Sequence, residues 1–195
     1  YGTEAMGGVV NIITRPPAPN EGMLSGSATA TAGMQGRLDG SARVALARGA
    51  WSAAGDVGRR GVQSAPGVGA NDGALAARVD GALKLRWSPD SARAAELSLL
   101  ALDERQRWRS TGGLYSFSDD QQLNARIGGS WRIGRHRFAP GLSLSHQDHL
   151  ARASAFTLPI AGDTGQRQIQ RIVQGELIYA AALSPRVAVD GGVQV

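Results

Sequence analysis

Long stretches of this sequence alternate apolar and polar residues with a period of two. In the clearest stretch, 75–87, apolar or small residues occupy every odd position and most even positions carry charge. Successive side chains of a β-strand point to opposite faces, so this period predicts strands with one apolar and one polar face. The same alternation runs through 123–133 and 171–183. These residues favour an all-β, antiparallel fold.

Turn-forming residues divide the chain into nine expected strands. Their expected ranges are 22–32, 37–48, 51–63, 74–87, 93–108, 121–133, 136–150, 168–183 and 186–195. Several exceed the roughly 9–11 residues that a strand needs to cross a bilayer. Purely apolar runs are only a few residues long, as at 99–102, so a bilayer could be crossed only by a β-barrel.

The expected connections alternate between tight and long. The tight ones are Gly49-Ala50, Ser88–Ala92, Gly134-Arg135 and Ser184-Pro185, and the first connection, Gly33–Gly36, is also short. The long polar ones are 64–73, 109–120 and 151–167. The sheet would then have short turns at one end, which we call the trimmed end, and long loops at the other. This is typical of outer-membrane barrels, which have short periplasmic turns and longer extracellular loops.

Three tryptophans lie beside the tight connections. Trp51 follows one, and Trp87 and Trp131 each precede one, whereas Trp108 lies at the other end of its strand. Aromatic residues gather at membrane interfaces, so we expect the first three to form part of a girdle at the trimmed end. The alternative is that they are ordinary core residues.

The polar strand faces carry the candidate lumen residues. These are Arg78, Asp80, Lys84, Arg86, Arg126 and Arg132. They could contact a plug or guide an anionic ligand, or they could simply form a hydrated wall of mixed charge. The net charge of +5 does not predict nucleic-acid binding, because the arginines are scattered along the chain rather than clustered.

The first fourteen residues form a distinct motif, YGTEAMGGVVNIIT. Gly7-Gly8 permits a close backbone approach, and the β-branched run 9–13 suits a strand buried on both faces. The proline-rich segment 15–21 then ends the strand and serves as a stiff linker. Taken alone, the motif could also be a glycine turn before any buried strand.

The motif resembles the end of the plug domain of TonB-dependent outer-membrane receptors. The matching positions are Tyr1, Gly2, Ala5, Gly7, Gly8, Val9, Val10, Asn11, Ile12, Ile13 and Thr14. The resemblance implies a plug end at 1–14, a linker at 15–21 and the first part of a transmembrane β-barrel at 22–195. Such receptors fold a plug inside a barrel of about 22 strands. Because both ends of the chain look cut, we expect a partial barrel wall with an open edge.

The resemblance also implies a function and a set of partners. It implies active uptake of a scarce nutrient, a ferric siderophore or cobalamin, across the bacterial outer membrane. Energy would come from the TonB complex, through an N-terminal region that this chain lacks, and lipid would surround the barrel. A passive porin or autotransporter barrel is the main alternative, followed by an outer-membrane barrel enzyme.

Two further groups of polar residues are candidate sites. His146, Asp148 and His149 lie close in sequence, but in a strand His149 points away from the other two, and no catalytic set is found. We therefore expect no enzyme activity. Asn71 and Asp72 precede a glycine and could offer oxygen ligands to Ca²⁺, although a plain turn explains them as well. No other cofactor is expected.

Overall fold

The computed structural model describes residues 24–33, 37–63, 75–109, 114–155, 164–184 and 187–195. The motif at 1–14, the linker at 15–21 and the calcium candidates Asn71 and Asp72 lie outside these residues. Within the described part of the chain, no helix has the length and apolar character needed to cross a membrane.

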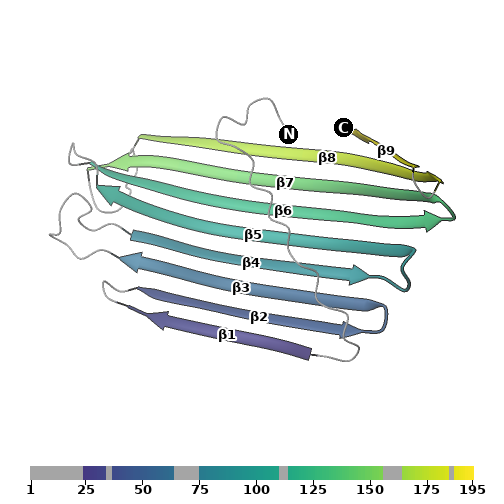
Figure 1. Ribbon diagram of the computed structural model, residues 1–195. Helices are drawn as coiled ribbons and strands as arrows, with labels where there is room; N and C mark the ends of the chain where they lie inside the picture. The colour runs from purple at the N-terminus through teal and green to yellow at the C-terminus, as the bar shows by residue number, and fades with distance from the viewer. Residues whose placement is uncertain (1–23, 34–36, 64–74, 110–113, 156–163, 185–186) are drawn as a thin grey trace.

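The described residues form nine antiparallel strands in one layer. The strands are β1 Leu24–Ala32, β2 Leu38–Arg48, β3 Trp51–Gln63, β4 Leu75–Trp87, β5 Arg93–Arg109, β6 Tyr115–Ile133, β7 His136–Ser154, β8 Thr164–Ser184 and β9 Val187–Gln194. Each strand pairs with the next along the chain, so they lie side by side in sequence order (Figure 1). The expectation of an all-β antiparallel sheet is confirmed.

The sheet is an open wall. Its order begins at β1 and ends at β9, and these two strands do not pair with each other. The sheet therefore matches an arc of a barrel and leaves two edges. The tight connections after β2, β4 and β6 lie at one end of the wall, at the right of Figure 1.

The expected long connections at 109–120 and 151–167 were wrong in length. Strand β6 already begins at Tyr115, β7 continues to Ser154, and β8 begins at Thr164. Tyr115 pairs with Arg109 on one side and with Ser154 on the other. Tyr115 and Phe117 alternate with Ser116 and Ser118, a strand signal that the prediction missed, and backbone pairing with β5 and β7 holds the segment extended through Asp119 and Asp120.

The turns at the trimmed end are fixed by local chemistry. Gly49 and Gly134 adopt φ angles of 56° and 61°, which favour glycine, and each sits in a two-residue hairpin. In the turn before β5, Asp90 Oδ1 accepts hydrogen bonds from the amides of Ala92 and Arg93 at 2.9 and 2.8 Å. The side chain of Arg93 donates to Asp90 Oδ2 at 2.7 Å.

Almost nothing in the described sheet is buried. The buried apolar residues are only Ala47, Phe117 and Ala181. A soluble domain packs a sheet face against a second layer, and these described residues supply none. The sheet therefore depends on something outside itself to cover its apolar side chains.

We predict that Asp90 holds the β4–β5 turn in a pH-dependent way. The hydrogen bond from Arg93 is the main cause that lowers the pKa of Asp90 below its ordinary value. A carboxyl with a lowered folded pKa contributes stability above its unfolded pKa and loses it as the pH falls through the folded value. Asp90→Ala should accelerate hydrogen exchange at Ala92 and Arg93, after correction for intrinsic rates.

Asp90→Asn is the matched control, because it keeps an acceptor for both amides and removes the charge. Its exchange should be slower than that of Asp90→Ala and should no longer change across the acid range. If Asp90→Ala exchanges at the parent rate, the turn does not depend on this carboxylate.

Candidate functional site

The register of the sheet divides its residues into two faces. One row of directly paired residues crosses eight strands: Gly26, Val44, Gly55, Leu83, Leu99, Ala125, Leu144 and Val173. The neighbouring row points to the other side: Ser25, Ala45, Ala54, Lys84, Ser98, Arg126, Ser143 and Gln174. We call the side with Leu83 the apolar face and the side with Lys84 the polar face.

A charge-free band crosses the apolar face. It runs along β4 from Trp87 to Val79 and along β6 from Trp131 to Leu123, and each stretch covers about 26 Å of strand. Within the described residues, all but five of the exposed large apolar side chains belong to this face. The exceptions are Leu100, Trp108, Leu114, Ile172 and Ile178.

Aromatic side chains mark the trimmed end of the apolar band. Trp51 pairs with Trp87, and their ring centroids are 6.4 Å apart. Trp131 pairs with Phe138, which in turn lies 5.2 Å from the ring of Tyr179. The three tryptophans predicted as a girdle thus share one face and one end of the sheet. Phe138 and Tyr179 were missed, although both fall on the apolar side of their alternating strands.

A glycine lets one of these aromatic side chains lie flat on the sheet. A Cβ atom added at Gly129 would be 2.5 Å from the ring of Trp131. The indole of Trp131 therefore covers Gly129, which lies in the same paired row as Trp87 and Ala95. This contact brings Trp131 level with the other two tryptophans.

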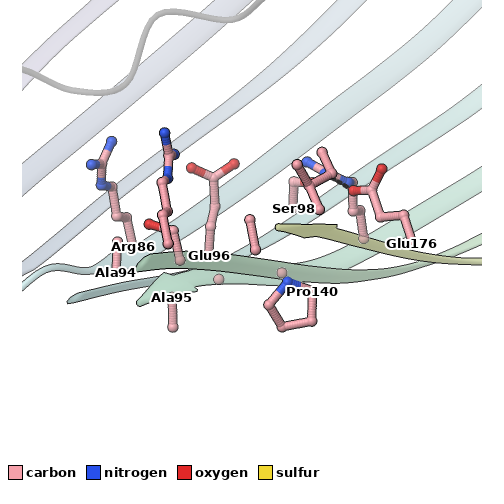
Figure 2. A pocket seen from close by; sticks show the side chains of 14 residues that line it. Arg86, Ala94, Ala95, Glu96, Ser98, Pro140 and Glu176 are labelled. Carbon is pink, nitrogen blue, oxygen red and sulfur yellow. Dashed lines mark hydrogen bonds and ion pairs between the residues drawn. The ribbon is translucent and has the colours of Figure 1, made fainter. Parts of the chain in front are cut away.

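The six residues predicted to line a lumen share the polar face. Lys84 pairs with Glu96 at 3.0 Å across the β4–β5 ladder, and Arg78 pairs with Asp80 at 3.0 Å along β4. Figure 2 shows Arg86, Glu96 and Glu176 rising from one side of the sheet, whereas Ala95 and Pro140 point to the other. Arg78, Asp80 and Lys84 thus have charged partners, whereas Arg86 and Arg132 have no ion-pair partner among the described residues.

One ion pair on the polar face spans three strands. Arg126 on β6 contacts Glu176 on β8, and Gly141 of β7 lies between them in the sheet. A Cβ atom at Gly141 would be 2.5 Å from Glu176 Oε1. The carboxylate thus crosses β7 only because that position has no side chain.

Two hollows at the trimmed half of the polar face gather arginines. The larger, about 330 Å³, is lined in part by Arg86, Arg126 and Glu176. The smaller, about 220 Å³, lies at the turn before β5 and includes Arg132. Arg137 lines both hollows and was missed. Arg137 is recognised as a residue of this site because it pairs with Arg132 in the β6–β7 register, and the sequence alone does not give that register.

The outer half of the polar face over β6–β8 has a different chemistry. It is rich in amides and hydroxyls and carries no arginine or lysine among the described residues. His149 Nδ1 lies 2.5 Å from Asp120 Oδ1, and Ser118 donates to Asp120 Oδ2 at 2.8 Å. His146 and Asp148 point to the apolar face, as the strand period requires.

No metal centre emerges from the described residues. They contain no group of three or more His, Cys, Asp or Glu side chains that could hold an ion. The His149–Asp120 pair therefore offers two groups at most. The arrangement as a whole places an uncharged band on one face of the sheet and charged side chains opposite it, so the two faces suit two different environments.

Comparison with known proteins gives likenesses among solved structures, where four chains match. No family model matches the chain, and no curated protein matches it. Among solved structures, the sheet is similar to a chain named copper transporter OprC, with 14% sequence identity and a TM-score of 0.44. The alignment covers 92% of this chain and 37% of that chain, so this chain spans well under half of that structure's length.

We predict that Gly141 is required for the Arg126–Glu176 contact. A double-mutant cycle with Arg126→Ala and Glu176→Ala should give a coupling of about 0.5 kcal/mol, typical of a cross-strand charge pair. In a Gly141→Ala background the coupling should vanish, because the new Cβ occupies the path of the carboxylate. Unfolding of the complete protein in detergent provides the measurement.

Gly175→Ala is the matched control for the coupling. A Cβ at Gly175 meets nothing within 4 Å, so this background should keep the full coupling. A coupling that survives in Gly141→Ala would show that Glu176 reaches Arg126 by another path.

Proposed function

We propose that this chain forms part of the barrel wall of a TonB-dependent receptor, which transports a ferric siderophore or cobalamin across the bacterial outer membrane. The observation that carries the proposal is the charge-free band on one face of a single-layered sheet, opposite a charged face. Hydrocarbon is the environment that suits the first face, and water suits the second.

The size of the apolar face supports a lipid environment. Soluble monomers rarely expose a contiguous apolar patch larger than a few hundred Å². Here the exposed apolar side chains continue from β1 to β9 without a covering layer among the described residues. The band is about 26 Å long on the strand, which at a tilt of about 40° spans about 20 Å of the membrane normal, most of the roughly 25 Å apolar belt of outer-membrane barrels.

The aromatic row supports the direction of insertion. Trp51, Trp87, Trp131, Phe138 and Tyr179 lie where the band meets the tight connections, as interfacial aromatics do. Tyr179 also bonds to His136 Nδ1 at 2.6 Å, so its hydroxyl end is polar while its ring covers the sheet. The trimmed end would then face the periplasm and the longer connections the exterior.

The polar face would line the lumen and meet the plug. At the trimmed half, the pairs Lys84–Glu96 and Arg126–Glu176 lie beside Arg86, Arg132 and Arg137, and this mixed charge suits a hydrated wall. Active transport is proposed from the resemblance of Tyr1–Thr14 to the plug end of these receptors. The work is then movement of cargo, driven through TonB, with no bond made or broken by this chain.

We predict that new charge is tolerated on only one face of the sheet. Ile127→Lys and Leu83→Lys should block insertion, because a lysine near the middle of the lipid face costs about 2–4 kcal/mol. Asn124→Lys places the same charge on the polar face of β6, and Arg126→Ala removes one from it. Both should insert normally. The measurement is the folded, heat-resistant fraction of the complete protein in phosphatidylcholine vesicles.

Equal insertion of Ile127→Lys and Asn124→Lys would overturn the orientation of the sheet. Equal loss in both would show that β6 tolerates no charge on either face, which also contradicts a lumen.

We predict that uptake through the complete protein requires energy. Cells that express it should accumulate a ferric siderophore or cobalamin, and accumulation should stop on deletion of TonB or addition of an uncoupler. A passive porin would equilibrate its solute in either condition. Uptake that persists unchanged after TonB deletion would contradict active transport and favour the porin alternative.

A further inference from the structure

The polar face changes its chemistry between its two halves. The trimmed half carries charged side chains such as Lys84, Arg126 and Glu176. Toward the longer connections lies a region of β5–β8 that we call the outer patch. It comprises the polar-face residues of these four strands from the row of Leu100 to the row of Trp108.

Amides and hydroxyls dominate the outer patch. Gln122, Gln147 and Gln170 pair side by side in one row across β6, β7 and β8. In the next row, Asn124 pairs with Ser145. Each side-chain amide offers two hydrogen-bond donors and an acceptor. The outer patch therefore presents a dense array of uncharged donors and acceptors.

The outer patch carries two carboxylates and, among its described residues, no arginine or lysine. The carboxylates, Glu104 and Asp120, pair directly across β5 and β6. Gln106 donates to Glu104 at 2.6 Å, and Ser118 donates to Asp120 at 2.8 Å. His149 Nδ1 lies 2.5 Å from Asp120 Oδ1. The negative charge of these carboxylates would repel an anionic solute.

The neighbouring strand adds no net positive charge beside these carboxylates. The row of Glu104 continues on β4 with Arg78. The Nε atom of Arg78 donates to Asp80 at 3.0 Å on the same strand. The strand β4 thus adds a balanced ion pair to this level of the polar face.

Exposed apolar side chains lie among the polar groups of the outer patch. Trp108 is 41% exposed, Leu100 is 45% exposed and Ile172 is 46% exposed, although all three point to the polar face. Contact of apolar surface with water is unfavourable, so a wall that met only water would favour polar residues here. Apolar surface with a few hydrogen-bonding groups is instead typical of small-molecule sites.

The position of the outer patch suits contact with cargo on its way in. The patch lies toward the longer connections, at the left of Figure 1, and these connections face the exterior in the proposed orientation. A solute that enters the lumen from outside would therefore meet the outer patch before the charged pairs of the trimmed half.

We propose that the outer patch binds the transported cargo and selects an uncharged cargo that carries amide groups and apolar surface. This inference rests on the proposed function and narrows its substrate class. The side-chain amides of the patch bond to amides of the cargo, and Leu100, Trp108 and Ile172 cover its apolar surface. Glu104 and Asp120 disfavour anionic chelates.

Binding of three metal chelates to the complete protein in neutral detergent tests the charge preference. The probes are cyanocobalamin, an uncharged ferric trihydroxamate and a triply anionic ferric tris-catecholate, each measured by equilibrium dialysis. At least one uncharged probe should bind about tenfold more tightly than the tris-catecholate, because juxtaposed like charges weaken binding. Tighter binding of the tris-catecholate, or binding of neither uncharged probe, would overturn the proposal.

Two opposite charges at one position show whether the bound cargo is uncharged there. Gln147→Lys and Gln147→Glu both remove an amide from the middle of the outer patch, so each should weaken binding of the preferred uncharged probe to a similar extent. If the lysine variant binds this probe tightly and the glutamate variant does not, the contact is with a negative group, which contradicts the proposal.

A matched pair of isoleucines on β8 tests the apolar contact. Ile172 belongs to the outer patch, whereas Ile178 lies on the same face beside the hollow of the trimmed half. Ile172→Ala should weaken binding of the preferred uncharged probe about tenfold, because it removes apolar surface from the site. Ile178→Ala should bind as the parent does, and both variants should keep the heat-resistant fold. Parent-like binding by Ile172→Ala would show that Ile172 meets the plug or water instead of cargo, and would overturn the contact.

Uptake by cells separates failure of this inference from failure of the proposed function. Accumulation of the tris-catecholate that depends on TonB, without binding of an uncharged probe, would overturn the role of the outer patch and leave active transport standing. Binding of an uncharged probe that depends on Ile172, without accumulation that depends on TonB, would support the outer patch and contradict active transport.

Discussion

Strand register is the constraint on which the rest of this structure depends. Because side chains alternate along a strand, a slip of one residue would move every side chain of that strand to the opposite face. Pairing stays in step from β1 to β8, and the shift recorded between described strands occurs near the trimmed end of β8, between Ala182 and Ser184. The apolar band and the aromatic row exist only because the pairing keeps the same set of alternating side chains on one face from β1 to β8.

The same kind of charge has different consequences on the two faces. On the polar face, pairs such as Arg126–Glu176 are accessible to water and contribute little to stability, so they can vary without loss of the fold. On the apolar face, charge is absent from the band and begins again at Arg59 and Asp103. In the proposed membrane orientation, the boundary between these zones sets how deep the sheet can lie in a bilayer.

Much of the sheet could be predicted from local sequence. The strand ends next to the long connections could not. The alternation at 75–87 and the glycines at 49 and 134 gave strand and turn positions that agree with the structure. The segment 115–120 was expected to be a loop, because Asp119 and Asp120 interrupt the short alternation of Tyr115 and Phe117 with Ser116 and Ser118. Its extended form comes from pairing with β5 and β7, which local periodicity cannot report.

The sequence by itself determined which residues of a strand share a face, because the alternation of side chains between the two faces is a local property of the backbone. It also placed the tight turns, since left-handed φ angles select glycine there. Only the tertiary structure decided which residues meet across strands. Glu176 crosses Gly141 to reach Arg126, and Arg107 and Arg152 lie on either side of Phe117 in one row of the sheet. These neighbours are set by hydrogen-bond register between segments, and no period within one segment encodes that register.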